Sequence, residues 1–234
     1  MLMAQRRKVR EIWFAKDIDP APILSDIEEL AHAQRVTILE VPRRKLDDMA
    51  RTDAPQGVIA FGAPIPETSI GDLLKPENGV KPFLVAVDGV TDPGNLGALL
   101  RCCDGAGVTG VLLPKHRTVH VTPTVTKASA GAVEHVPMAL VSGLPTAIGQ
   151  MKDNGIWVVG FDDKSSTTLF EIGDLAREGI CLVLGAEGTG LSRLVRERCD
   201  QVVSIPMLGQ VSSLNVSAAA ALATYEVTRV RVSR

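Results

Sequence analysis

Aromatic residues are scarce in this sequence, at 3%, and its formal net charge is only -2. The charge argues against a protein that coats nucleic acid nonspecifically. No apolar run approaches the roughly 20 residues that span a bilayer. The basic start, MLMAQRRKVREIW, is not followed by an apolar segment and cleavage site, so export is not indicated. We therefore expect a globular cytoplasmic protein that is not embedded in a membrane.

Cysteine is also sparse, and its spacing excludes the usual metal and redox motifs. The four residues are Cys102, Cys103, Cys181 and Cys199, with no C-x-x-C pair and no histidine spacing that suits zinc. Cys102 and Cys103 point in different directions on a helix, which disfavours a redox pair. We expect reduced, buried thiols and no metal.

The stretch GAGVTG, residues 105–110, fits the dinucleotide-binding pattern G-x-G-x-x-G. That pattern has mechanical meaning only after a strand and at the start of a helix. Here it follows an expected helix, NLGALLRCCDGA, and precedes an expected strand, GVLLP. The glycines therefore indicate a helix C-terminus, and a nicotinamide dehydrogenase is disfavoured.

The order of expected elements indicates an α/β protein in two parts. Residues 9–61 read as a small α/β unit, with strands at REIWFA, VTILEV and GVIAF and a helix over residues 23–34. We place a small domain at residues 1–62, a Pro- and Gly-rich linker with one short helical turn at 63–82, and a larger domain at 83–234. In the larger domain, strands at FLVAVD, GVLLP, WVVGFD, CLVLG and VVSIPM alternate with helices at 95–106, 145–154, 191–199 and 215–229. Such alternation predicts a parallel sheet with helices on both faces.

Three polar, glycine-bearing loops follow strands of this sheet. They are DGVTDPGNLGALLR, GAEGTGLSRL and MLGQVSSLNVS. Ligands bind beyond the carboxyl ends of strands in open parallel sheets, so the loops predict one composite pocket. In the second loop, Gly185, Gly188 and Gly190 permit close backbone approach and Glu187 supplies a carboxylate. Taken alone, these glycines are better explained by a strand-to-helix turn.

Two further groups of polar residues need an explanation. Arg101 stands in the apolar run ALLRCC, six positions after Asn95, and burying an unpaired guanidinium is costly. A phosphate or carboxylate ligand would explain it, as would an ion pair with Glu187. In the last loop, Ser213, Asn215 and Ser217 precede an Ala-rich helix, and one of them is expected to cap it.

The three segments DGVTDPGNLGALLRCCDGAG, LVLGAEGTGLSRLVRERCDQVVSIPM and VSSLNVSAAAALATYEVTR resemble, in order, the three motifs of the SpoU (TrmH) family of RNA ribose 2'-O-methyltransferases. The resemblance covers about residues 83 to 230. It implies the SPOUT α/β knot, a C-terminal trefoil knot on a parallel sheet flanked by helices. It also implies a homodimer that binds S-adenosylmethionine and needs no metal. Carried onto this chain, the cofactor pocket comprises Leu184, Gly185, Gly188, Ile205, Met207 and Leu214.

The same resemblance implies a catalytic set of Asn95, Arg101, Glu187, Ser213 and Asn215. The ribose hydroxyl is a poor nucleophile, so such an enzyme must remove its proton and hold it in line with the methyl group. Arg101 is the family's proposed proton acceptor. An arginine is normally always protonated, so positioning of the substrate is an equal interpretation.

Residues 9–61 resemble the small ribosomal-protein-like domain that precedes the knot in many ribosomal-RNA members of the family. Its usual opening strand and helix are not found here, which predicts a truncated or reduced domain. The stretch KASAGAVEHVP, residues 127–137, is more similar to the ribosomal-RNA branch than to the tRNA branch. The few aromatics favour recognition of phosphates and shape over base stacking. Candidate RNA contacts, each also explained as a solvated surface charge, are Arg6, Arg7, Arg43, Arg44 and Lys45.

The expected activity is therefore 2'-O-methylation of a guanosine in large-subunit (23S) ribosomal RNA. The alternatives are a tRNA methyltransferase, an antibiotic-resistance ribosomal-RNA methyltransferase, and a noncatalytic RNA-binding assembly factor. The motifs do not separate an antibiotic-resistance enzyme from one that carries out housekeeping modification, because the reaction is the same and only the RNA address differs.

Overall fold

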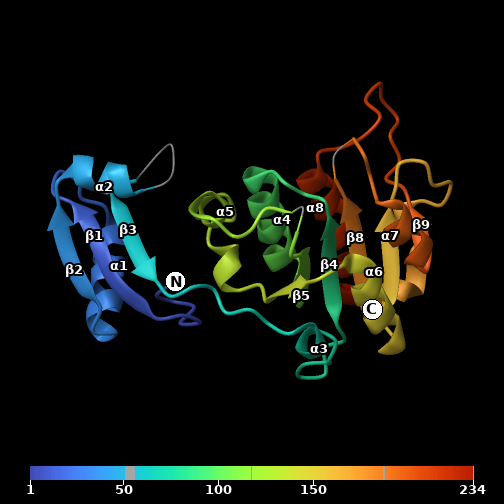
Figure 1. Cartoon of the computed structure of the whole chain (residues 1–234), viewed down its shortest axis with the longest axis horizontal. Helices are drawn as coiled ribbons and strands as arrows, with labels where there is room; N and C mark the ends of the chain where they lie inside the picture. The colour runs from blue at the N-terminus through green and yellow to red at the C-terminus, as the bar shows by residue number, and fades with distance from the viewer. Residues whose placement is uncertain (51–55, 117, 187, 234) are drawn as a thin grey trace. The chain divides into compact units, whose positions relative to one another are not determined.

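The structure is a computed structural model that describes residues 1–50, 56–116, 118–186 and 188–233 (Figure 1). The chain divides into two compact units, Met1–Pro66 and Glu67–Arg234. Glu187, which the sequence analysis places in the catalytic set, lies outside the described residues. Within the described part of the chain, no helix is long and apolar enough to cross a membrane.

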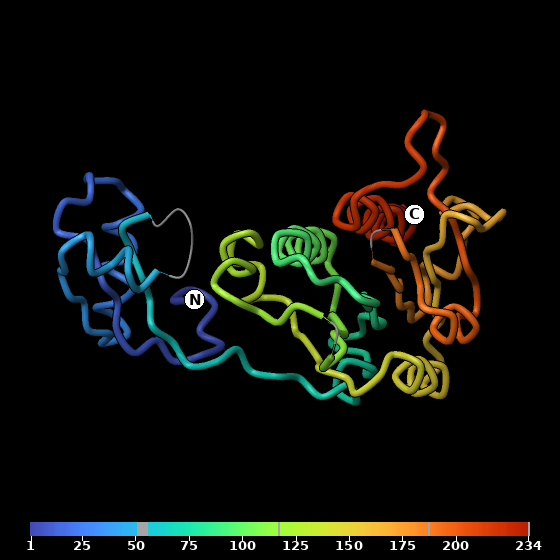
Figure 2. Tube along the Cα trace, turned by 45° about the horizontal axis from the view of Figure 1, so that its top comes forward, coloured from blue at the N-terminus to red at the C-terminus, as the bar shows by residue number. Residues whose placement is uncertain are grey.

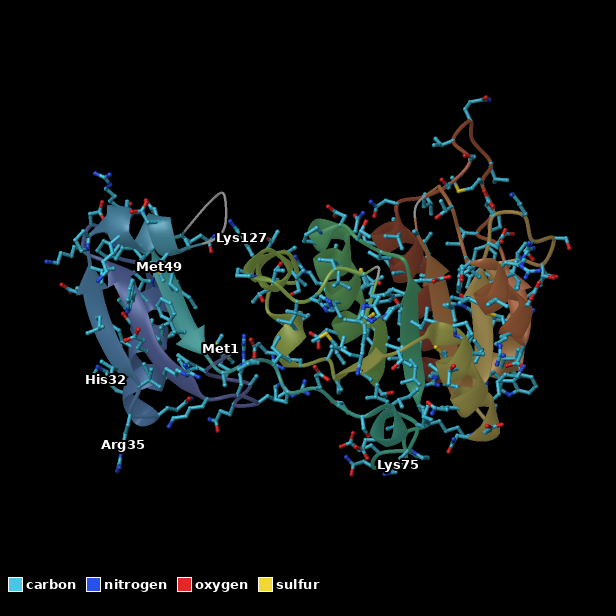
Figure 3. The ribbon with its side chains drawn as sticks, in the orientation of Figure 1. Met1, His32, Arg35, Met49, Lys75 and Lys127 are labelled. Carbon is cyan, nitrogen blue, oxygen red and sulfur yellow. The ribbon has the colours of Figure 1, made fainter. Side chains whose placement is uncertain are left out.

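The first unit is a three-stranded sheet with its two helices. Its strands are in the order β2-β1-β3, with β1 parallel to β2 and antiparallel to β3. Ile12 and Phe14 of β1 pack with Ala31 of α1 in one core, and Ala15 packs with Leu46 of α2 in another. Figure 3 shows His32 and Arg35 at the far end of α1, directed away from the sheet. The elements are β1 (Val9–Ala15), α1 (Pro22–Ala33), β2 (Thr37–Val41), α2 (Arg43–Met49) and β3 (Val58–Gly62).

The second unit is built on a six-stranded parallel sheet in the order β6-β5-β4-β8-β7-β9. Its strands are β4 (Phe83–Asp88), β5 (Gly110–Pro114), β6 (Met138–Val141), β7 (Trp157–Phe161), β8 (Ile180–Gly185) and β9 (Gln201–Val203). The central pair, β4 and β8, is buried along nearly its whole length, as expected for a sheet covered on both faces. The predicted α/β class with a parallel sheet is confirmed.

Helices cover both faces of this sheet (Figure 2). Leu84 and Ala86 of β4 face a core that includes Ile148 of α6 and Val195 of α7. On the opposite face α4 packs against both α8 and α5. The helices are α3 (Ile70–Leu73), α4 (Pro93–Gly105), α5 (Pro123–Ala128), α6 (Leu144–Asp153), α7 (Arg193–Arg198) and α8 (Val216–Val232), with short 3-10 turns at Ala132–Glu134, Leu169–Glu171 and Gly173–Arg177.

Several predicted boundaries were wrong, for identifiable reasons. The strand expected over VVSIPM ends at Val203, because Pro206 has no N–H and Ser204 pairs only with the segment at Thr167 and Thr168. The helix expected from Leu191 begins at Arg193, since Ser192 is its N-cap and has an extended backbone. The elements α2, α5 and β6 were not predicted.

Candidate functional site

The N-termini of α4 and α8 meet through their polar side chains. The Asn215 Nδ2 donates to Asn95 Oδ1 at 2.8 Å, across 120 positions of sequence. The Asn215 Oδ1 accepts from the N–H of Ser217 at 2.9 Å and from its hydroxyl at 2.6 Å, so Asn215 is the expected N-cap of α8. One amide therefore both begins a helix and fixes a second side chain.

Asn95 is held in turn by the start of its own helix. Its backbone N–H donates to Asp92 Oδ1 at 2.6 Å, and Asp92 is the N-cap of α4. A proline follows the cap, as is favoured at the first helical position. The sequence analysis did not single out Asp92, although the pair Asp-Pro ahead of an apolar helical pattern was a signal for this cap.

Arg101 does not join this pair in the single chain. It is exposed, and it lies about 9 Å further along α4 than Asn95, from the helical rise of six residues. Its place in an apolar run therefore implies no buried guanidinium: Leu99, Leu100 and Cys103 occupy the buried face of the helix. Its expected alternative partner, Glu187, is outside the described residues.

The second predicted loop forms a tight reversal after β8. The N–H of Gly190 donates to the carbonyl of Ala186 at 2.9 Å. Gly188 and Gly190 have φ values of +78° and +64°, which favour glycine. A Cβ on Gly185 would lie 2.2 Å from the carbonyl carbon of Gly190, so only a bare backbone fits there. Leu184, one residue earlier, is buried in the sheet.

The third group of predicted residues lies on the segment between β9 and α8, which projects from the sheet (Figures 1 and 2). Ile205, Met207 and Leu214 are half-buried, whereas Ser213 is exposed. Leu208 and Val211 at the end of this projection are 99% and 70% exposed. Apolar side chains on this segment are thus accessible in whole or in part.

A cleft of about 580 Å³ lies at the same edge of the sheet. Its walls come from the ends of β4, β5, β6 and β8, and they include Asp88, His116, Ser142 and Thr189. The sequence analysis expected one composite pocket over three loops, and the first two of these loops line this cleft. The walls at His116 and Ser142 were not expected, because His116 stood only in a basic cluster and β6 was missed. Polar residues after strands were the available signal.

The four thiols are poorly suited to chemistry. Cys103 and Cys181 are buried, and Cys102 and Cys199 are partly buried. Burial raises the pKa of the Cys199 thiol to about 12, and burial also raises the pKa of the other three. Across the described ranges, no three His, Cys, Asp or Glu residues are arranged to hold a metal ion.

Most of the candidate RNA contacts in the first unit have partners within that unit. Arg43 Nε pairs with Asp17 at 3.0 Å, and Lys45 Nζ lies 4.7 Å from the centroid of the Trp13 ring. Arg7 donates to the carbonyl of Ala63 at 2.9 Å, and Arg6 is half-buried. Arg44 is exposed. In the second unit, Lys127 projects from α5 (Figure 3).

Comparison with known proteins finds similarity along both units. A family described as "SpoU rRNA Methylase family" matches residues 82–225, and one described as "RNA 2'-O ribose methyltransferase substrate binding" matches residues 1–68. A protein of Bacillus subtilis (strain 168), YacO, named for the TrmH family of tRNA/rRNA methyltransferases, is 43% identical over 227 residues, which cover 96% of this chain and 90% of that protein.

Solved structures are similar over almost the whole chain. The SpoU methyltransferase AviRb of Streptomyces viridochromogenes, in complex with S-adenosylmethionine, superposes with a TM-score of 0.83 at 26% identity, covering 99% of this chain and 86% of that one. A crystal structure described as an RNA 2'-O ribose methyltransferase gives 0.79 at 27% identity, covering 99% and 84%.

Proposed function

Because this chain belongs to the SpoU family of RNA 2'-O-ribose methyltransferases, we propose that it methylates the 2'-oxygen of a guanosine in large-subunit ribosomal RNA. The family establishes the reaction class, an S-adenosylmethionine-dependent transfer to RNA. The nucleotide, the kind of RNA and the residues assigned below are the proposal.

The observation that carries the proposal is the hydrogen bond between Asn215 and Asn95. Two polar side chains from distant motifs meet at the start of two helices, beside the exposed Ser213. Helix capping accounts for the hydrogen bonds that Asn215 Oδ1 accepts, but not for the hydrogen bond that fixes the side-chain amide of Asn95. Preorganised amides and hydroxyls of this kind orient a ribose hydroxyl without rearrangement during the reaction.

The residues beside this pair fit the cofactor. The half-buried Ile205, Met207 and Leu214 offer apolar surface to an adenine ring, and the backbone of residues 185, 186 and 188–190 offers N–H and C=O groups to its edge. Nothing would lie within 4 Å of a Cβ on Gly188, so that part of the loop is open to a ligand. When bound, S-adenosylmethionine supplies a methyl group already activated by its positively charged sulfur.

In this proposal, Asn95, Ser213 and Asn215 position the ribose hydroxyl, and Glu187 completes the set. Arg101 contacts the RNA phosphate next to the reacting ribose. It acts either as a positioning group or, with the help of that phosphate, as the proton acceptor. Arg101→Lys distinguishes the two roles. A lysine retains the positive charge that positioning requires, but its pKa is lower than that of arginine, which changes the pH at which it can accept a proton.

Ribosomal RNA is favoured over tRNA by the description of the family that matches residues 82–225, which names rRNA. The relatives' shared name includes both kinds of RNA.

A homodimer is also part of the proposal, and the exposed Leu222 and Tyr225 on α8 offer an apolar face for it.

The test is methyl transfer from labelled S-adenosylmethionine to unmodified ribosomal RNA and to tRNA, followed by mapping of alkali-resistant ribose positions. We expect one labelled guanosine in large-subunit ribosomal RNA. Label in tRNA alone would overturn the substrate assignment.

Arg101→Ala is expected to abolish transfer and leave cofactor binding nearly unchanged; loss of both would indicate a structural role.

A further inference from the structure

The cleft between the ends of β4 and β8 occupies the position where open parallel sheets bind ligands. The chain leaves β4 toward α4 on one face, and it leaves β8 toward α7 on the other. Connections that diverge in this way open a crevice beyond the carboxyl ends of the two strands. At about 580 Å³, the cleft lies in the size range of small-molecule pockets and accommodates a nucleobase.

The cleft is continuous with the site proposed for methyl transfer. One wall, at Asp88, Gly89 and Thr91, is the loop that leads into Asp92 and Asn95. The opposite wall, at Ala186, Thr189 and Gly190, is the glycine loop assigned to the cofactor. A nucleotide whose ribose lies near Asn95 therefore has its base within reach of the cleft.

Asp88 gives the cleft a defined chemical preference. It is half-buried, and its Oδ2 accepts from the N–H of Ser192 at 2.7 Å. No described residue donates to its Oδ1, so one carboxylate oxygen is available to a ligand. An ionised carboxylate only accepts hydrogen bonds, which suits the N1–H and 2-amino groups of guanine. Adenine has an unprotonated N1 instead, whose lone pair would face the carboxylate.

The other walls complete a site for a flat, polar-edged ring. Leu144 and Leu191 are buried aliphatic side chains that line the cleft. Ser142 and His116, both exposed, follow β6 and β5 and can donate to an acceptor such as guanine O6. This arrangement needs no aromatic stacking.

We propose that this cleft binds the guanine of the target nucleotide, turned out of its stack, and that Asp88 reads its N1–H and 2-amino edge. Enzymes that act on a nucleotide within folded nucleic acid commonly bind the base in such a pocket. The inference rests on the proposed function and deepens it by assigning the residues that select the base.

Asp88→Asn tests the proposal, because asparagine retains an oxygen for Ser192 but directs an amino group into the cleft. The substrates are fragments of ribosomal RNA carrying guanosine or adenosine at the mapped position. For the variant we expect kcat/KM on the guanosine fragment to fall on the order of 10- to 100-fold, the effect of one hydrogen bond to a charged group. We expect the guanosine-to-adenosine preference to fall at least as much, with an unchanged Kd for S-adenosylmethionine.

Asp153→Asn, the same change at the exposed far end of α6, is the control and should behave as the native protein. A second variant, Ser142→Ala, leaves Asp88 intact. Native protein should lose activity when 2-aminopurine, which lacks both O6 and the N1–H, replaces the target guanine, and the further loss from Ser142→Ala on that substrate should be small because O6 is already absent.

An unchanged base preference in Asp88→Asn, with methyl transfer still present, overturns the inference alone. A weakened Kd for S-adenosylmethionine in parallel with lost transfer overturns it by assigning the cleft to the cofactor. No transfer by the native protein to any RNA overturns the proposed function itself.

Discussion

Replacing Asn215 separates helix capping from the proposed catalytic role. Asn215→Ala removes the cap of α8, worth about 1 kcal/mol, and the hydrogen bond to Asn95, worth about another 1 kcal/mol. The free energy of unfolding should fall by about 2 kcal/mol, and Tm by about 4 to 8 °C for a chain of this size. Asn215→Asp keeps an oxygen for the Ser217 N–H and adds a negative charge that a helix N-terminus favours. Its stability should therefore stay within about 1 kcal/mol of the native protein.

Methyl transfer should nevertheless be lost in both variants, because neither side chain donates to Asn95 Oδ1. The measurements are urea unfolding and transfer of labelled methyl groups to RNA. Asn154→Ala, at the end of α6, is the control and should retain full transfer. An Asn215→Asp variant as unstable as Asn215→Ala would refute the capping argument. Full transfer by either variant would remove the pair from the site.

Three further results are expected. Gly185→Ala places a Cβ within 2.2 Å of the Gly190 backbone, so it should destabilise the protein by about 3 kcal/mol and weaken binding of S-adenosylmethionine, as measured by calorimetry. Hydrogen bonds from Arg229 hold the pKa of Glu226 below its ordinary value, so this pair stabilises the fold at neutral pH. The stabilisation decreases as the pH falls through that lowered pKa. In urea titrations, Glu226→Gln should therefore lower the free energy of unfolding by less than about 1 kcal/mol at pH 7 and by still less near pH 3. Because burial raises the pKa of all four thiols, to about 12 for Cys199, alkylation by iodoacetamide at pH 8 should be slow until urea is added, as followed by mass spectrometry.

The sequence predicted the elements that hydrophobic patterns determine. The strand FLVAVD and the helix that follows it were recognised because a continuous aliphatic run and an apolar helical period are local signals. The failures came where a nonlocal contact overrides the local pattern. The strand expected over VVSIPM ends at Val203, because the next residue, Ser204, pairs with the distant segment at Thr168.

The candidate site was predictable as a set of loops but not as a geometry. Resemblance pointed to Asn95 and Asn215 independently, and their hydrogen bond depends on how α4 and α8 pack. The exposure of Arg101 likewise depends on which face of α4 meets its neighbours. The cleft at Asp88 requires the strand order, with β4 beside β8, which no local pattern contains.

That strand order has a consequence for synthesis on the ribosome. The central strand β4 pairs with β8 in the register Phe83 to Ile180, so roughly a hundred residues must be translated before its inner edge is filled. At typical rates of synthesis that interval lasts on the order of 5 to 20 s. During it, β4 can pair only with β5, and an aliphatic strand edge stays open to neighbouring chains. In the unit Met1–Pro66 the three strands pair with one another, so none of them needs a partner that is translated much later. We expect this unit to fold first.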